Sequence, residues 1–322
     1  MKLLLLGGPK FLGRAVADAA HEHGHELTFF NRGRTSPELY PQVEKLVGDR
    51  EGDLAGLAGR TWDAVIDTCG YVPHVVRASA EALAGSGLYC FVSSISVYAD
   101  FSEPVDEPSA LAELEEAPSD QLTADFSNYG ALKALCESAV TDTFGGRALN
   151  VRPGLIVGPH DPTGRFTYWP NRVARGGEVL AVGPPERPTQ FVDVRDLGEW
   201  LVALCEREVV GTFNATHPGL SWAKLLDTCR EVSNSDARVT YVAEGFLLQN
   251  EVGEWMELPL WLAGPAMAYA DRVDVGRAVA AGLRFRSLED TVRATLERAP
   301  ITDTVGLAPE REAALLAKWH DR

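Results

Sequence analysis

The residues best suited to chemistry in this chain are Tyr129 and Lys133, which form a Tyr-x-x-x-Lys pair. Residues four apart on a helix project from one face, so the phenol and the ammonium would lie side by side. A neighbouring ammonium favours the phenolate and lowers the pKa of a tyrosine. A tyrosine with a lowered pKa could act as a general acid or base near neutral pH, which an ordinary tyrosine does not. Such pairs also occur by chance on solvated helix faces, so the surrounding sequence must decide.

The chain opens with four leucines and a glycine-rich turn, Gly-Gly-Pro-Lys-Phe-Leu-Gly over residues 7–13. A glycine turn between a strand and a helix lets backbone N–H groups approach a pyrophosphate at the positive end of the helix. Lys10 stands where the middle glycine is usual, which weakens the motif taken alone. The residues predicted to contact a dinucleotide here are Gly7, Gly8, Lys10, Phe11, Leu12 and Gly13.

The second predicted strand, residues 26–30, ends in Asn31, Arg32 and Arg34. Sites that prefer NAD usually place an acid here to hold the ribose hydroxyls. A guanidinium matches the dianion of a 2′-phosphate, so this strand end favours NADP(H) over NAD(H). The alternative is that both arginines are simply solvated.

Two later strand ends carry further candidate cofactor contacts. Asp49 and Arg50 follow the strand predicted at 43–47, and an aspartate there can accept a hydrogen bond from the adenine amino group. Thr68, Cys69 and Gly70 follow the strand predicted at 64–67, in a small-residue loop that would pass under the pyrophosphate and ribose. A turn or helix-cap role is equally open for the aspartates at these strand ends.

Short apolar runs alternate with helical patterns through the first two thirds of the chain. Strands are predicted at 2–6, 26–30, 43–47, 64–67, 88–92 and 148–151, and helices at 11–23, 73–84 and 128–144. This alternation predicts an α/β fold, a doubly wound parallel (Rossmann) sheet with a smaller C-terminal substrate lobe. Residues 1–155 would be the dinucleotide-binding domain, with further sheet elements to about 215, and 156–322 mainly the substrate lobe. An acidic segment at 102–124 is a candidate lid, and the tail at 274–297 is predicted to be helical.

Composition excludes several classes of protein. The formal charge of −16 over 322 residues makes nucleic acid and anionic membranes poor partners. The five cysteines are odd in number and contain no Cys-x-x-Cys, which argues against disulfides and a structural zinc site. We therefore predict free thiols, a cytoplasmic location and no metal centre. No apolar stretch approaches the roughly 20 residues of a membrane span.

Five stretches, in order, resemble the extended short-chain dehydrogenase/reductase family of the NAD-dependent epimerase/dehydratase type. They are GGPKFLG at 7–13, GDR at 48–50, FVSSISVY at 91–98, YGALK at 129–133 and VRPGLIVGP at 151–159, with QFVDVRDLGEW at 190–200 as a sixth. The ordered set is far more specific than any one member.

The resemblance implies a Ser–Tyr–Lys triad of Ser94, Tyr129 and Lys133. Ser94 would polarise the substrate oxygen, with Ser93 and Ser96 as alternatives. Tyr129 would move the proton, and Lys133 would bind the nicotinamide ribose and lower the tyrosine pKa. Pro153, Gly154 and Leu155 would form the wall beside the nicotinamide.

One departure from the family pattern narrows the chemistry. Family members that dehydrate nucleotide sugars carry an Asp-Glu pair directly after the catalytic serine or threonine, where this chain has Ile95 and Ser96. Dehydration by that mechanism is therefore not expected. The candidate substrate residues are Ser96, Arg165, Tyr168, Gln190 and Arg195, with a solvated interface loop as the alternative for the arginines. His160-Asp161 is interpreted as part of a turn.

Three hypotheses of function follow. The first is an NAD(P)-dependent oxidoreductase or epimerase of a sugar-like or nucleotide-sugar alcohol or ketone. The second is an NADPH-dependent reductase of an aromatic or polyketide-like ketone. The third is a non-catalytic dinucleotide sensor or RNA-binding protein, since the basic glycine turn also resembles an atypical subgroup that includes RNA-binding proteins. The resemblance further implies a small-molecule substrate and a homodimer through the helices near 73–84 and 128–144.

Overall fold

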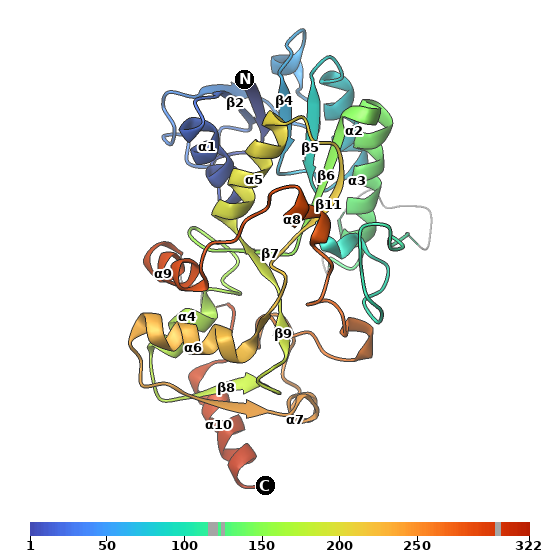
Figure 1. Cartoon of the computed structure of the whole chain (residues 1–322). Coiled ribbons are helices and arrows are strands. Elements are labelled where there is room, and N and C mark those ends of the chain that lie inside the picture. The colour runs from blue at the N-terminus through green and yellow to red at the C-terminus, as the bar shows by residue number, and fades with distance from the viewer. Residues whose placement is uncertain (115–121, 124–125, 300–303) are drawn as a thin grey trace.

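The computed structural model describes residues 1–114, 122–123, 126–299 and 304–322, and its larger part is a seven-stranded parallel sheet (Figure 1). The strand order is β11-β6-β5-β4-β1-β2-β3. The strands are β1 (Lys2–Leu6), β2 (Glu26–Asn31), β3 (Glu44–Val47), β4 (Ala64–Asp67), β5 (Leu88–Val92), β6 (Ala148–Pro153) and β11 (Gly211–Ala215). Every neighbouring pair is parallel, so the predicted doubly wound sheet is confirmed.

The order of the strands reverses at β1, which lies between β2 and β4. Ligands of doubly wound sheets bind in the crevice beyond the carboxyl ends of the strands at such a switch point. The glycine turn follows β1, and the segments predicted to contact the cofactor follow β2, β3, β4 and β6. The topology therefore brings these separate segments to one edge of the sheet.

The run of four leucines in β1 is explained by burial on both faces of the sheet. Leu3 and Leu5 belong to one apolar core, and Leu4 and Leu6 belong to another on the opposite face. All four side chains are fully buried. Side chains alternate between the two faces of a strand, so a strand covered on both sides is apolar throughout.

Two pairs of helices cover these faces. Helices α1 (Leu12–Glu22) and α5 (Val194–Glu206) pack together over the first core. Helices α2 (Pro73–Ala82) and α3 (Tyr129–Phe144) pack together over the second. The predicted homodimer through α2 and α3 stays a prediction.

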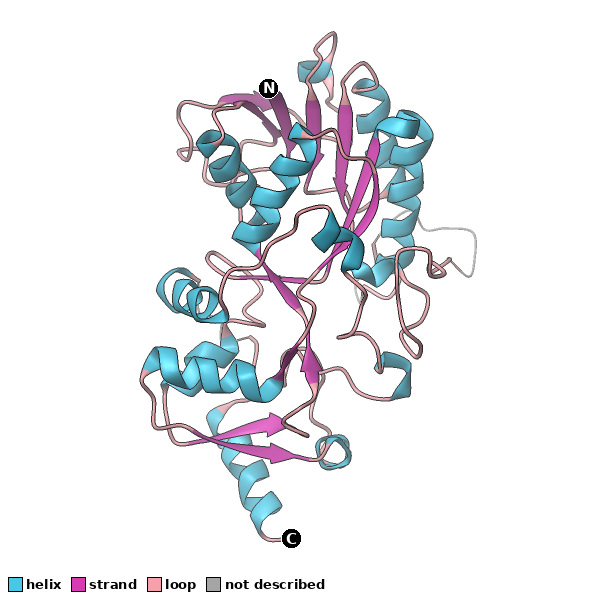
Figure 2. Ribbon diagram, in the orientation of Figure 1, coloured by secondary structure: helices cyan, strands magenta, loops and turns pink. Residues whose placement is uncertain are grey.

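The smaller lobe has its own apolar core, with Trp169, Trp222 and Trp261 fully buried at its centre. Three two-stranded sheets and a set of helices surround it (Figure 2). The pairs are β7 (Leu155–Val157) with β10 (Phe191–Asp193), β9 (Pro188–Thr189) with β12 (Leu220–Ser221), and β8 (Glu178–Val182) with β13 (Arg238–Val242). The helices are α4 (Tyr168–Ala174), α6 (Trp222–Ser233), α7 (Glu244–Gln249), α9 (Leu288–Arg298) and α10 (Pro309–His320).

The tail differs from the single helix predicted over 274–297. A short helix, α8 (Gly276–Ala280), ends before Gly282, whose φ of 94° is unfavourable for a continuing helix of L-residues. A new helix, α9, begins at Leu288, where the Ser287 side chain accepts a hydrogen bond from the Asp290 N–H at 3.2 Å. The predicted stripe is confirmed within α9, because Val292 is buried and Leu288 and Leu296 pack against the lobe core.

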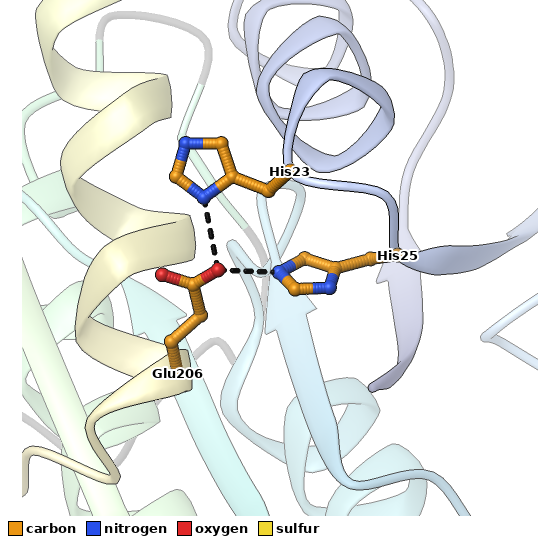
Figure 3. A group of neighbouring side chains, drawn as sticks. All are labelled: His23, His25 and Glu206. Atoms are coloured by element: carbon orange, nitrogen blue, oxygen red, sulfur yellow. Dashed lines mark hydrogen bonds and ion pairs between the residues drawn. The ribbon is translucent and has the colours of Figure 1, made fainter.

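A cluster of His23, His25 and Glu206 joins α1 to α5 at the amino edge of the sheet, opposite the crevice (Figure 3). The Glu206 Oε1 atom lies 2.9 Å from His23 Nδ1 and 2.8 Å from His25 Nε2, and the other nitrogen of His23 is 2.8 Å from Glu199. Their ligand atoms lie within 4.8 Å of one another, close enough for a metal ion to bridge. These groups already satisfy one another through hydrogen bonds.

Among the described residues, no helix is both long and apolar enough to cross a membrane. All five cysteine thiols are free, and four of them are buried. The predicted lid at 102–124 lies partly outside the described residues.

Candidate active site

The glycine turn after β1 is shaped by close backbone contacts. A Cβ atom on Gly13 would lie 2.1 Å from the Gly8 carbonyl oxygen, so only glycine fits there. Gly7 has a φ of 129°, and a Cβ on it would lie 2.5 Å from Thr68 Oγ1. By contrast, a Cβ on Gly8 would meet nothing closer than 3.7 Å. No side chain caps the N-terminus of α1, so the positive end of this helix and the open space at Gly8 fit a pyrophosphate.

The other predicted residues of this turn take different positions. Lys10 is exposed, and Phe11 precedes α1 with a φ of 46°. Leu12 is buried in the core beneath the helix. Lys10 therefore remains accessible to a ligand, whereas Leu12 could contribute to binding only through its backbone.

At the end of β2, Asn31 is hydrogen-bonded to the protein, whereas Arg32 and Arg34 face solvent. The Asn31 side chain donates to the Gly7 carbonyl at 3.0 Å and accepts from the Gly33 N–H at 2.8 Å, which ties this strand end to the glycine turn. Arg32 and Arg34 are exposed, and neither pairs with any residue that the structure describes. Both guanidinium groups are therefore available to an anion at this edge.

Arg50 is already bonded to protein groups instead of facing an open cofactor site. Its guanidinium makes two 2.7 Å hydrogen bonds to the Asp67 carboxylate, which is fully buried. Tyr89 donates to the same carboxylate at 2.8 Å, and Arg50 also reaches Ser79 at 3.0 Å. Asp49 lies in the turn beside it, where its backbone pairs with that of Asp53.

The loop after β4 is packed between the glycine turn and α3. The Thr68 hydroxyl donates to the Leu6 carbonyl at 3.1 Å, and the Cys69 N–H donates to Asp67 at 3.1 Å. A Cβ on Gly70 would lie 2.5 Å from the Phe91 ring. This packing fixes the loop at the edge where β1 and β4 end.

Lys133 is buried and binds the two strand ends that flank the site. Its Nζ atom donates to the carbonyls of Gly70 at 2.7 Å and Val92 at 2.6 Å, and lies 4.2 Å from the centre of the Phe91 ring. Burial lowers the pKa of Lys133 to about 8. Tyr71, which the sequence interpretation overlooked, covers this group with its ring centre 5.4 Å from Nζ.

Tyr129 is the first residue of α3, and its side chain is largely enclosed by the protein. A hydrogen bond from the Ser94 side chain works to lower the tyrosine pKa, as does the charge of Arg165. Burial outweighs both, so the pKa of Tyr129 is raised and the predicted lowering by Lys133 is wrong. The close fit depends on Gly130, since a Cβ there would lie 2.0 Å from the Ser96 carbonyl oxygen.

Ser94 and Ser96 form one small hydroxyl cluster at the end of β5. The Ser94 hydroxyl donates to Ser96 Oγ at 3.1 Å and accepts from the Ser96 N–H at 3.1 Å. Ser93 is buried, and its hydroxyl has no partner. Of the three serines, Ser94 is the one whose side chain acts to lower the pKa of Tyr129.

The residues predicted to form the wall beside the nicotinamide lie at the end of β6 and directly after it. Pro153 is buried, Leu155 is half-buried, and the Gly154 N–H donates to Ala215 at 3.1 Å. A Cβ on Gly154 would lie 2.7 Å from Thr216 Oγ1, so this crossing into the lobe also requires a glycine.

The predicted substrate residues do not form one group. Tyr168 lies in the lobe core. The Gln190 side chain exchanges hydrogen bonds with the Val273 backbone at 3.1 and 2.9 Å. Arg195 pairs with Asp193 at 2.7 Å. Of the five predicted residues, Ser96 bonds to Ser94, and Arg165 acts to lower the pKa of Tyr129.

Two residues near Arg165 were not among the predicted site residues. Trp255 lies under the guanidinium, with its ring centre 4.6 Å from Arg165 Cζ. Asp161 does form the expected turn, accepting from the Thr163 N–H at 2.8 Å, yet its second carboxylate oxygen is buried without a partner. Only the charged and aromatic composition of these segments could have indicated them.

Comparison with known proteins identifies the family. The model of the NAD dependent epimerase/dehydratase family matches residues 68–215. A 2-alkyl-3-oxoalkanoate reductase of Stenotrophomonas maltophilia is 30% identical over 254 residues, which cover 69% of this chain and 68% of that protein. The chain belongs to the NAD-dependent epimerase/dehydratase family of extended short-chain dehydrogenases/reductases, and is an NAD(P)-dependent enzyme.

Solved structures share the fold across nearly the whole chain. A UDP-N-acetylglucosamine 4-epimerase from Bacillus cereus superimposes with a TM-score of 0.66 at 16% identity, covering 92% of this chain and 95% of its own. A UDP-glucuronic acid 4-epimerase from Bacillus cereus in complex with NAD gives a TM-score of 0.65 at 16% identity, covering 91% of this chain and 97% of its own. At such identities the likeness establishes the fold and leaves the substrate open.

Proposed function

We propose that this protein is an NAD(P)H-dependent ketone reductase, and that Ser94, Tyr129 and Lys133 form its catalytic site. The proposal is supported by the positions of these residues. Tyr129 and Lys133 lie one turn apart at the start of α3, and Ser94, which follows β5, acts to lower the pKa of Tyr129. Lys133 donates to the Gly70 and Val92 carbonyls beside the ends of β4 and β5. The name of the Stenotrophomonas relative, a reductase, favours net reduction over an epimerisation that returns the hydride.

The nicotinamide, when bound, supplies the hydride for the carbonyl carbon. Tyr129 donates the matching proton to the carbonyl oxygen, and its raised pKa keeps the phenol protonated at neutral pH. Ser94 donates a hydrogen bond to the same oxygen and orients Tyr129. Lys133 holds the Gly70 loop against the end of β5 and is the predicted partner of the nicotinamide ribose.

The glycine turn provides the place for the cofactor. Gly7 and Gly13 close the turn tightly and Gly8 leaves open space, the arrangement that a pyrophosphate requires. At the ribose end, the unpaired and exposed Arg32 and Arg34 support a preference for NADP(H). Pro153 and Leu155 are the predicted wall beside the nicotinamide.

Transfer of deuterium from cofactor labelled at the reacting nicotinamide carbon tests the proposal. With 3-oxooctanoate as the ketone, we expect deuterium on the carbinol carbon of the alcohol, seen by mass spectrometry. Alcohol formed without deuterium, or no alcohol from this ketone or from neutral ketones, would contradict reduction by this site.

The same assay with labelled NADH measures the cofactor preference. We expect NADPH to be the better cofactor, and Arg32→Ala to weaken NADPH binding about tenfold, because one charged hydrogen bond is lost, without weakening NADH binding. Equal binding of the two cofactors by the wild type would show the preference to be wrong and leave the reductase proposal intact.

A further inference from the structure

Arg165 is a half-buried arginine of the smaller lobe, and its guanidinium pairs with no residue that the structure describes. Its Nε atom is buried and makes no hydrogen bond. No ion pair or hydrogen bond joins its guanidinium to any residue that the structure describes, although its backbone N–H reaches Thr163. Buried polar groups are normally hydrogen-bonded, so a guanidinium whose Nε donor is buried and unused is a candidate ligand site.

Three other arginines of this lobe are already bonded. Arg172 pairs with Glu312 at 2.6 Å, Arg187 with Glu244 at 2.7 Å, and Arg195 with Asp193 at 2.7 Å. A diphosphate clamp that used these arginines would have to break their ion pairs. One free guanidinium fork matches a single carboxylate by two parallel hydrogen bonds.

The surroundings of Arg165 place that carboxylate next to the reacting carbonyl. The positive charge of Arg165 acts to lower the pKa of Tyr129, which indicates that the two groups lie on the same side of the site. The Asp161 carboxyl influences the pKa of Arg165 but forms no ion pair with it. Burial raises the pKa of Asp161 itself. Trp255 lies against the guanidinium and offers an apolar wall for a substrate chain.

We propose that Arg165 binds the carboxylate of an oxo-acid substrate whose carbonyl lies beside Tyr129, with its alkyl chain against Trp255. The inference rests on the proposed reductase function. It narrows the substrate from a ketone to a carboxylic acid that carries the ketone a short distance from the acid group. The printed name of the relative, an oxoalkanoate reductase, describes such a molecule.

The test compares 3-hydroxyoctanoate with its methyl ester in the oxidation direction, using NADP⁺. The two probes differ in the charge that Arg165 would recognise. We expect the wild type to favour the acid, and Arg165→Gln to lower kcat/KM for the acid about 10- to 100-fold while leaving the ester unchanged. Arg165→Lys should restore part of the loss, because lysine keeps the charge and lacks the planar fork. Arg175→Gln, an exposed arginine at the end of α4, is the matched control and should behave as wild type.

Binding is measured separately by tryptophan fluorescence, which does not require turnover. If the wild type binds the acid through Arg165 but does not oxidise it, the inference stands and the proposed function fails. If Arg165→Gln weakens the acid and the ester equally, or if the wild type binds both probes equally or neither, the inference is wrong. Tight binding of UDP-glucose that is lost in Arg165→Gln, with no preference for the acid, would overturn it in favour of a diphosphate.

Discussion

The two sides of the candidate active site treat their buried charges differently. On the sheet side, Arg50 is held by Asp67, Arg152 by Glu137, and Lys133 by two backbone carbonyls. On the lobe side, Arg165 Nε and Asp161 Oδ2 are buried without partners. The sheet side is thus a frame whose buried charges are paired by the fold, whereas the lobe side keeps a charged donor and acceptor that a ligand can use.

Breaking the frame should have the largest effect on stability. Asp67→Asn removes the charge opposite buried Arg50, so we expect the free energy of unfolding in urea to fall by about 3–5 kcal/mol. The double variant Arg50→Met with Asp67→Leu should recover much of this loss, because it leaves no unpaired charge.

Arg165→Gln is the matched change on the lobe side. It breaks no ion pair, so we expect to lose only the contact with Trp255, about 0.5–1 kcal/mol. A loss as large as that of Asp67→Asn would contradict the contrast between the two sides.

The smallest effect is expected at the amino edge, where the pairs are exposed. A hydrogen bond with Glu206, followed by one with Glu199, raises the pKa of His23. Because the pKa is raised, the stabilisation that His23 gives the folded state is complete below about pH 6.5. It is lost as the pH rises through the folded-state pKa. His23→Gln should therefore cost less than about 1 kcal/mol at pH 6 and almost nothing at pH 9.

Urea unfolding of His23→Gln at the two pH values measures this difference, with exposed His21→Gln as control. A cost that grows with pH would contradict the assigned direction of the shift. Comparing this pair with the buried ion pairs of the sheet side separates the effect of burial from that of pairing, because Glu206 is paired and yet partly exposed.

Periodicity and turn chemistry were enough to predict the sheet. The doubly buried leucines, the glycine turn and the alternation of strands with helices are local patterns, so their interpretation did not depend on distant contacts. The break in the tail helix was missed because Gly282 and Ser287 act through φ and capping, which the apolar stripe does not reveal.

Sequence patterns predicted the candidate site less completely, because its charges are paired across long separations. Arg165 and Trp255 are 90 positions apart, and the lobe loops that hold them have no period from which a contact could be inferred. The spacing of Tyr129 and Lys133 indicated proximity, but the sign of the tyrosine pKa shift depends on burial, which spacing does not show.

The central claim is that Tyr129 donates the proton in a nicotinamide-dependent reduction, and Tyr129→Phe tests it most directly. The variant removes one hydroxyl and keeps the ring, whose centre lies 6.5 Å from the centre of the Tyr71 ring. We predict that kcat for the ketone falls about 10²–10⁴-fold while NADPH binding and the unfolding midpoint stay unchanged. Turnover at the wild-type rate in the folded variant would show that Tyr129 is not the proton donor.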